Sequence, residues 1–253
     1  MKKVLLFIGS LVSAASLATA ANNVSYTATA DPNSNPDGTN QFLAAVDVWT
    51  VTTAPGATGS DGAGSYYGSQ PSLGNAWQLF SYQNSGAGNG GSAFANTTFA
   101  GGALTIGQTV SINFNMRALD APNGSAGLSL QNGSGNAINF YIFGGGPGNY
   151  FYTDAGSSNV TAGSMTYQYQ SAFNIAFTVT GAGTYHAVAG SDAWNGTFSG
   201  SLVGMQVYDS RGGNASDVGF NNLVIVPEPG TVSLVIGGLA FLGFGIRRRV
   251  RRS

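Results

Sequence analysis

Polar and apolar residues alternate with a period of two in several stretches of this chain, and this pattern constrains the fold most strongly. Residues 109–116 read TVSINFNM, and residues 174–180 read NIAFTVT. Shorter examples lie at 127–130, 139–143 and 205–207. Successive side chains of a β-strand point to opposite faces, so each stretch predicts a strand with one buried and one solvent-facing side.

The longest of these stretches makes a sharp prediction. In residues 109–116 we expect the apolar positions to point into a core: Val110, Ile112, Phe114 and Met116. We expect the polar positions between them to point outward: Ser111, Asn113 and Asn115. A shift of one residue would reverse the two faces.

Clusters of glycine, proline, asparagine and serine separate the alternating stretches, as at 121–124, 132–135 and 144–148. Such clusters favour turns. No sustained helical stripe of apolar residues lies between the two termini. The pattern predicts an all-β fold, a jelly-roll-like two-sheet antiparallel β-sandwich of about 10 to 14 strands, as one extracytoplasmic domain over residues 21–226.

The N-terminus has the three parts of a secretory signal peptide. Lys2 and Lys3 form a positive start, residues 4–12 are apolar, and small residues surround a cleavage position at Ala18, Ala20 and Ala21. We therefore predict a signal peptide over residues 1–20 and export of the chain. Cysteine is absent, so an exported domain must be held together by its own core rather than by disulfides.

The C-terminus predicts a membrane segment. Residues 231–246 carry no charge, and a cluster of arginines follows them: Arg247, Arg248, Arg249, Arg251 and Arg252. As a helix these residues would span about 24 Å, somewhat short of the ~30 Å hydrocarbon core. The arginines form a membrane stop on the cytoplasmic side and place the domain outside. Pro227 and Pro229, on either side of Glu228, disfavour helix and keep the preceding link extended.

This tail, residues 227–253, closely resembles the PEP-CTERM sorting signal, which combines a Pro-Glu-Pro motif, a transmembrane helix and an arginine cluster. The resemblance implies that an exosortase-type enzyme processes the tail after a transient stay in the inner membrane, with the domain outside. It also implies a final place at the cell surface or in the extracellular matrix, and an association with biofilm or exopolysaccharide.

The last alternating stretch carries a second resemblance. Residues 215–225, ASDVGFNNLVI, combine an aromatic residue, an Asn pair and an aliphatic run. They are similar to the closing strand of concanavalin-like and carbohydrate-binding jelly rolls. That similarity supports the predicted fold, but a fold does not by itself give a function.

Charge argues against two classes of function. Residues 21–226 contain Arg117 and Arg211 as their only Lys or Arg and nine aspartates, a formal charge of −7. Nucleic-acid binding needs clustered cations, so we expect no nucleic-acid partner. A glycosidase needs two carboxylates, usually including a glutamate, and this span has no glutamate. Several aspartates lie in turn contexts instead: Asp31, Asp37, Asp61 and Asp120.

Other candidate chemistry is weak. His186 is the only histidine and no G-x-S-x-G motif accompanies it, so we interpret it as an ordinary strand residue. Gly86–Gly91 matches G-x-G-x-x-G, but the residues after it predict a strand instead of the required helix. Residues 31–38 resemble a calcium loop in which Pro36 and Phe42 replace the required Gly and Glu. We therefore predict no catalytic residues, no metal site and no cofactor.

Aromatic residues leave one question open. Several could stack on sugars or could pack in the core: Tyr66, Tyr67, Trp77, Tyr150, Phe151, Tyr152, Tyr167, Tyr169 and Trp194. Two hypotheses lead, ahead of a third, a lyase or hydrolase that would need a cluster of aspartates in a cleft. The first is a non-enzymatic envelope or matrix protein, sorted by its tail. The second is a carbohydrate-binding module of the jelly-roll type, with extracellular polysaccharide as its partner.

Overall fold

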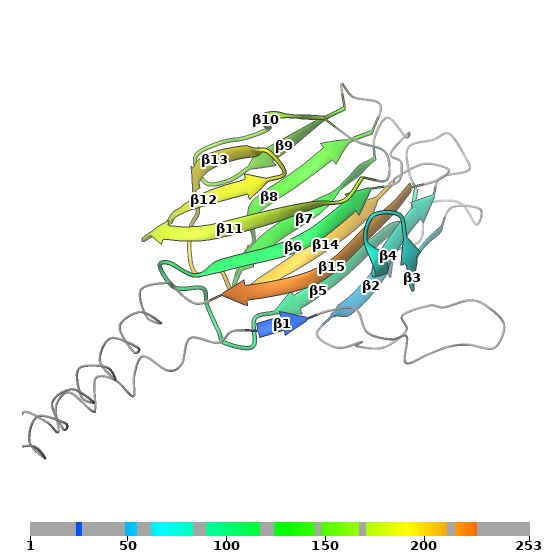
Figure 1. The fold of residues 1–253 in the computed structure, drawn as a ribbon, viewed down its shortest axis with the longest axis horizontal. Helices are drawn as coiled ribbons and strands as arrows, with labels where there is room; N and C mark the ends of the chain where they lie inside the picture. Colours follow the sequence, from blue (N-terminus) through cyan, green and yellow to red (C-terminus); the bar gives the residue numbers. More distant parts are fainter. Residues whose placement is uncertain are drawn as a thin grey trace, which may run out of the picture.

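The computed structural model describes residues 24–26, 49–54, 62–82, 90–116, 124–144, 148–166, 171–211 and 216–226. These residues form two antiparallel sheets packed face to face, as Figure 1 shows. The predicted all-β sandwich is confirmed. Fifteen strands are present in the described part, more than the 10 to 14 expected. The short strands β1 (Val24–Tyr26) and β2 (Thr50–Ala54) lie where the sequence shows no clear alternation, and each adds to a neighbour in a sheet.

The first sheet has eight strands. Its order is β13 (Asp192–Thr197), β12 (Thr184–Ala189), β11 (Phe173–Gly181), β6 (Thr109–Met116), β15 (Ser216–Val226), β4 (Gly74–Tyr82) and β3 (Gly62–Gln70), with β1 also paired to β15. The second sheet has seven strands. Its order is β10 (Val160–Thr166), β9 (Asn149–Thr153), β8 (Gly135–Phe143), β7 (Ser125–Asn132), β14 (Gly204–Ser210), β5 (Ser92–Thr98) and β2.

The period-two prediction for residues 109–116 is confirmed. Val110, Ile112 and Phe114 are fully buried and Met116 is 1% exposed, all within the core between the sheets. Ser111, Asn113 and Asn115 alternate with them and face away from the other sheet. Asn115 is nevertheless buried, and its side-chain amide donates a hydrogen bond to the Pro71 carbonyl oxygen at 2.6 Å, in the turn between β3 and β4.

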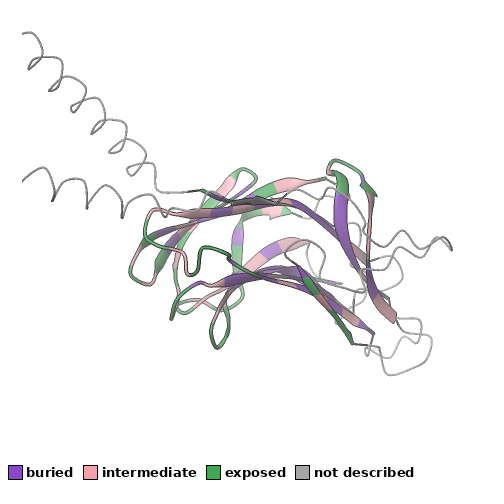
Figure 2. Ribbon diagram, turned by 90° about the horizontal axis from the view of Figure 1, so that it is seen from below, coloured by how far each residue is buried: buried purple, intermediate pink, exposed green. Residues whose placement is uncertain are grey.

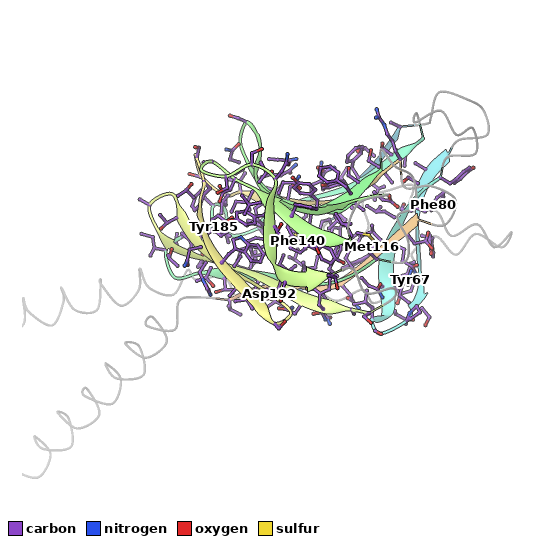
Figure 3. All side chains as sticks on the ribbon, turned by 90° about the horizontal axis from the view of Figure 1, so that it is seen from above. Tyr67, Phe80, Met116, Phe140, Tyr185 and Asp192 are labelled. Atoms are coloured by element: carbon purple, nitrogen blue, oxygen red, sulfur yellow. The ribbon has the colours of Figure 1, made fainter. Side chains whose placement is uncertain are left out.

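Aromatic rings fill much of the space between the sheets. Phe140 of the seven-stranded sheet stacks on Trp194 of the eight-stranded sheet, with ring centroids 5.8 Å apart. Trp49 packs on Phe220 at 5.0 Å near the other end of the core. Figure 3 shows the positions of Phe140, Met116 and Tyr185 in this layer. The apolar contact between the inner faces holds the sheets together.

The closing strand β15 contains a β-bulge that explains its sequence. Asn221 pairs with Asn113 and Val224 pairs with Ser111, so β15 has one extra residue between these pairs. Asn222 has a positive φ of 54°, and its backbone N–H donates to Asn221 Oδ1 at 2.7 Å. The bulge shifts the alternation by one residue. The even-numbered Val218 and Phe220 before it and the odd-numbered Leu223 and Ile225 after it are therefore all buried.

The membrane segment expected at 231–246 lies outside the described residues, as do the sorting motif, the arginine cluster and the signal peptide over residues 1–20. In the part of the chain that the structure describes, no helix is long and apolar enough to cross a membrane.

We predict different costs for two neighbouring substitutions on β6. Ile112→Ala removes a fully buried side chain and should lower the free energy of unfolding by about 2–5 kcal/mol. Ser111→Ala changes the outer face and should stay within about 0.5 kcal/mol. Urea unfolding of both variants measures the difference. Equal losses would show that β6 does not bury this face.

Candidate functional site

Two described aspartates join the sheets at one edge of the sandwich. Asp154, which follows β9, accepts hydrogen bonds from the Tyr185 hydroxyl at 2.9 Å and the Thr197 N–H at 3.0 Å. Asp192 on β13 accepts from the Met165 N–H at 2.5 Å and from Ser164 Oγ at 3.2 Å on β10. Each carboxylate thus links the seven-stranded sheet to the eight-stranded sheet. These bonds give both aspartates a structural role.

A third aspartate lies inside the sandwich. Asp209 on β14 is fully buried and accepts hydrogen bonds from Ser81 Oγ at 2.8 Å and from the Ser81 N–H at 3.2 Å. Ser81 belongs to β4, so this contact also joins the two sheets. A carboxylate with no exposed surface cannot reach a bound substrate. Among the described residues, no group of three or more His, Cys, Asp or Glu side chains could hold a metal ion.

His186 lies on the outer face of the eight-stranded sheet. Its neighbours Tyr185 and Ala187 on β12 are buried, and its Nδ1 is 3.0 Å from Asn195 Oδ1 on β13. Gly91, the last glycine of the G-x-G-x-x-G match, is followed directly by β5. The helix that a dinucleotide site requires is therefore replaced by a strand. Both residues fit the structural interpretation made from the sequence.

Most of the aromatic residues considered above pack in the core. Trp77, Tyr150 and Tyr152 are buried, and Tyr67 and Trp194 pack against the core from its margin. Tyr66 packs on Phe80 on the outer side of the eight-stranded sheet. Phe151 alternates with the buried Tyr150 and Tyr152 and so faces outward from the seven-stranded sheet. Tyr167 and Tyr169 lie outside the described residues.

Strand register places an aromatic row around Phe151 on the outer face of the seven-stranded sheet. Phe94 on β5 pairs with Tyr208 on β14, Tyr208 with Gly127 on β7, Gly127 with Tyr141 on β8, and Tyr141 with Phe151. Paired residues in neighbouring strands lie side by side on one face of a sheet. We call these five positions the aromatic row. It crosses five strands.

A second row of polar residues runs parallel to the first and lies two residues away from it on each strand. Asn96 pairs with Gln206, Gln206 with Ser129, Ser129 with Asn139, and Asn139 with Thr153. We call these positions the amide row. Gln206 Nε2 donates to Asn96 Oδ1 at 2.8 Å, and Ser129 Oγ donates to Asn139 Oδ1 at 2.8 Å. The side chains of this row are thus held in place by one another.

The seven-stranded sheet bends so that its outer face is concave. Figure 2, where it is the lower sheet, shows its strands arching along their length, with the inside of the bend turned away from the eight-stranded sheet. Because the strands bend lengthwise, the concavity runs across them, parallel to the two rows. The rows consist of aromatic, hydroxyl and amide side chains together with Gly127, and none of these residues is charged.

The sequence did not single out Phe94, Tyr141 or Tyr208, the other aromatic residues of the row. Each follows a small or apolar core residue in a period-two stretch, which predicts an outward side chain. For each strand by itself, that signal predicts which side chains lie on the same face. It does not show that β14 lies between β5 and β7, and that arrangement assembles the row.

The comparisons with known proteins identify the tail first. Residues 226–249 match the PEP-CTERM protein-sorting motif. The tail carries a sorting signal. This motif implies an exported protein that is sorted to the cell surface and processed by an exosortase. The match begins at Val226, the last residue of β15, so the sorting motif follows the closing strand directly. No curated protein matches the chain in sequence.

Solved structures with similar folds include concanavalin-like jelly rolls. A structure titled for endo-acting O-glycanases of the human gut microbiota has 10% identity and a TM-score of 0.51, covering 75% of this chain and 95% of its own. An alginate lyase from Corynebacterium sp. has 12% identity and a TM-score of 0.43, with coverages of 71% and 93%. The galectin LEC-6 from Caenorhabditis elegans has 12% identity and a TM-score of 0.38, with coverages of 52% and 89%. At 10% identity the likeness to the first of these structures shows the fold alone.

Two buried tyrosines make stability depend on alkaline pH. Burial raises the pKa of Tyr185 and of Tyr208 well above the ordinary value near 10. Above about pH 10 an unfolded chain releases protons that the folded chain keeps. The unfolded state then binds fewer protons, so the free energy of unfolding falls as the pH rises.

We predict that replacing both tyrosines reduces this dependence. The double variant Tyr185→Phe/Tyr208→Phe should lose less stability between pH 8 and pH 11 than the parent protein, as measured by urea unfolding at each pH. Tyr82→Phe, at a 37% exposed position, is the matched control and should follow the parent. An unchanged slope in the double variant would contradict this explanation.

Proposed function

We propose that the protein is an exported, non-enzymatic component of the cell envelope or extracellular matrix. The observation that carries this proposal is the PEP-CTERM motif at residues 226–249, which directly follows the closing strand of a β-sandwich. The chain reaches the inner membrane with its domain outside. Exosortase-type processing near Pro227, Glu228 and Pro229 then releases or transfers the domain to the surface or the matrix.

The bonds of three of the four described aspartates support a non-catalytic role. Asp154, Asp192 and Asp209 accept hydrogen bonds that join the sheets. His186 lies on the eight-stranded sheet, away from the concave face. A glycosidase instead needs two carboxylates that reach the same sugar bond. Incubation with polysaccharides should release no new reducing ends, and sustained release would overturn this part of the proposal.

We predict that the tail is processed rather than kept as an anchor. Most protein from the cell surface or medium should lack the residues beyond about 230, because an extended Pro-Glu-Pro link just outside the membrane is open to a protease. Replacing Pro227, Glu228 and Pro229 by alanine should accumulate full-length protein in the inner membrane. Deleting residues 247–253 should weaken retention and block processing, because it removes the arginine stop.

Intact-mass measurement decides between processing and anchoring. If the protein at the surface and in the medium still carries Arg252 and Ser253, the tail is a plain membrane anchor and the proposed sorting is wrong.

A second candidate function is carbohydrate binding by the concave face. The specific observation in its favour is the aromatic row beside the amide row, because sugars bind through an apolar face on aromatic rings and through hydroxyl groups on amides. This function is compatible with the first, since a matrix protein that binds polysaccharide remains non-enzymatic. A glycan array that includes the host's own matrix polysaccharide tests it, and an array without any binding would remove it.

A further inference from the structure

The aromatic row lies along the concave face, with its exposed rings at the two ends. Phe94 and Phe151 are half-buried, whereas Tyr208 and Tyr141 between them are nearly buried, at 7% and 4% exposed. Phe94 stacks on Tyr208 with centroids 6.5 Å apart and planes 29° apart. Tyr141 stacks on Phe151 at 6.2 Å and 30°. Between the two pairs, the Tyr208 hydroxyl donates to Asn139 Oδ1 at 3.2 Å. Since Tyr208 is on β14 and Asn139 is on β8, this bond carries the Tyr208 side chain across β7, which lies between them.

The residue of β7 in this row is a glycine, and the local geometry explains why. A β-carbon at Gly127 would lie 2.2 Å from the Phe140 carbonyl oxygen, which is shorter than any allowed contact. Gly127 therefore adds no side chain of its own beneath Tyr208. The aromatic row extends from β5 to β9, four strand spacings of about 4.8 Å each, or about 19 Å.

The amide row leaves three polar groups available beside the aromatic row. Asn139 Oδ1 accepts bonds from Ser129 and Tyr208, so the Asn139 side-chain NH₂ remains. In the Gln206–Asn96 bond the Gln206 NH₂ donates to the Asn96 carbonyl oxygen. Gln206 Oε1 and the Asn96 NH₂ therefore remain available. Within the described part of the chain these groups have no further hydrogen-bond partner. Held by their mutual bonds, they present a donor, an acceptor and a donor at fixed positions, which lowers the entropic cost of binding.

The charge on this face selects the class of ligand. Neither row contains a charged residue. Arg211 is the only Lys or Arg among the described residues, and it follows the end of β14. An acidic polysaccharide carries anionic groups along its length and is recognised by several cations, with Arg pairing carboxylates in a bidentate manner. The face instead offers uncharged hydrogen-bonding groups that match sugar hydroxyls.

We propose that the concave face binds a neutral, extended polysaccharide that crosses the strands, with Asn96, Gln206 and Asn139 as its specificity-determining residues. This inference rests on the proposed carbohydrate-binding function. The apolar faces of sugar rings lie on the half-buried Phe94 and Phe151 at the two ends of the row, and the sugar hydroxyls meet the amide row. Tyr208, which is nearly buried, acts as a positioning residue for Asn139.

The length of the aromatic row sets the length of the ligand. One sugar ring of an extended chain advances by a distance close to the strand spacing of about 4.8 Å. The affinity should therefore rise with oligosaccharide length up to about four or five sugars and then level off. Isothermal titration with a size series of one neutral oligosaccharide measures this dependence. An affinity that is already maximal for a single sugar would contradict a chain that crosses the strands.

The decisive experiment compares neutral and acidic polysaccharides on two sets of variants of the full-length protein in detergent. The probes are neutral soluble glucans, galactans and mannans on one side and alginate and pectate on the other, with affinity electrophoresis as the readout. Asn139→Ala and Gln206→Ala should each weaken neutral-polysaccharide binding by about 3- to 10-fold. Phe151→Ala should weaken it by about 10-fold or more, through lost stacking.

Asn174→Ala and Asn195→Ala are the matched controls, because they remove exposed amides from the outer face of the eight-stranded sheet. They should bind like the parent protein. Tyr208→Phe keeps the ring and removes only the bond to Asn139, so it should weaken binding less than Phe151→Ala. Circular dichroism and thermal unfolding identify any variant that fails to fold, and the remaining variants then decide.

Each outcome separates the inference from the function on which it rests. Neutral binding that is lost in the concave-face variants and kept in the controls supports both. Binding only to alginate or pectate overturns the neutral class but leaves carbohydrate binding in place. Neutral binding that the concave-face variants do not change overturns the site. If the protein binds none of the probes and does not bind the host's matrix polysaccharide, the carbohydrate-binding function itself is overturned.

Discussion

The apolar contact between the inner faces of the two sheets is the interaction on which the rest of the structure depends. The chain has no cysteine to form a disulfide, so this contact has to hold the domain. It is made by period-two strands whose inward residues are fully buried, such as Ile112 and Phe177, and by rings that stack across the layer, such as Phe140 on Trp194. Burial of this apolar surface provides the main favourable free energy of folding.

The polar groups inside the sandwich follow from that contact. A carboxylate between two sheets is stable only when donors meet it, and Ser81 supplies both a hydroxyl and an N–H to Asp209. At the edge, Asp154 and Asp192 hold β9 and β10 against β12 and β13 in the same way. These three aspartates thus join the two sheets, and neither the aromatic row nor the amide row contains a charged residue.

Because the inner faces provide the stability, the outer face of the seven-stranded sheet can carry side chains for another purpose. Rings such as Phe94 and Phe151 would stabilise the core if they pointed inward, yet they lie half-buried on the concave side, in the same row. The amides beside them satisfy one another only in part. Groups that are already oriented on a rigid sheet suit the proposed carbohydrate binding, because affinity is gained when little order is lost on binding.

The sequence alone determined the strongly alternating strands, such as β6 and β11, the direction of the side chains within them, and the sorting motif at the tail, because each of these is a local pattern. It also indicated the closing strand, where the Asn pair marks the bulge at Asn221 and Asn222. It did not show β1 and β2, where the alternation is unclear. Only the tertiary structure decided which strands are neighbours. Phe94 and Tyr208 are more than a hundred residues apart in sequence, and they stack because β14 pairs between β5 and β7. Strand order and register depend on non-local pairing across the whole sheet, and so the aromatic row and the amide row could not be read from any one segment.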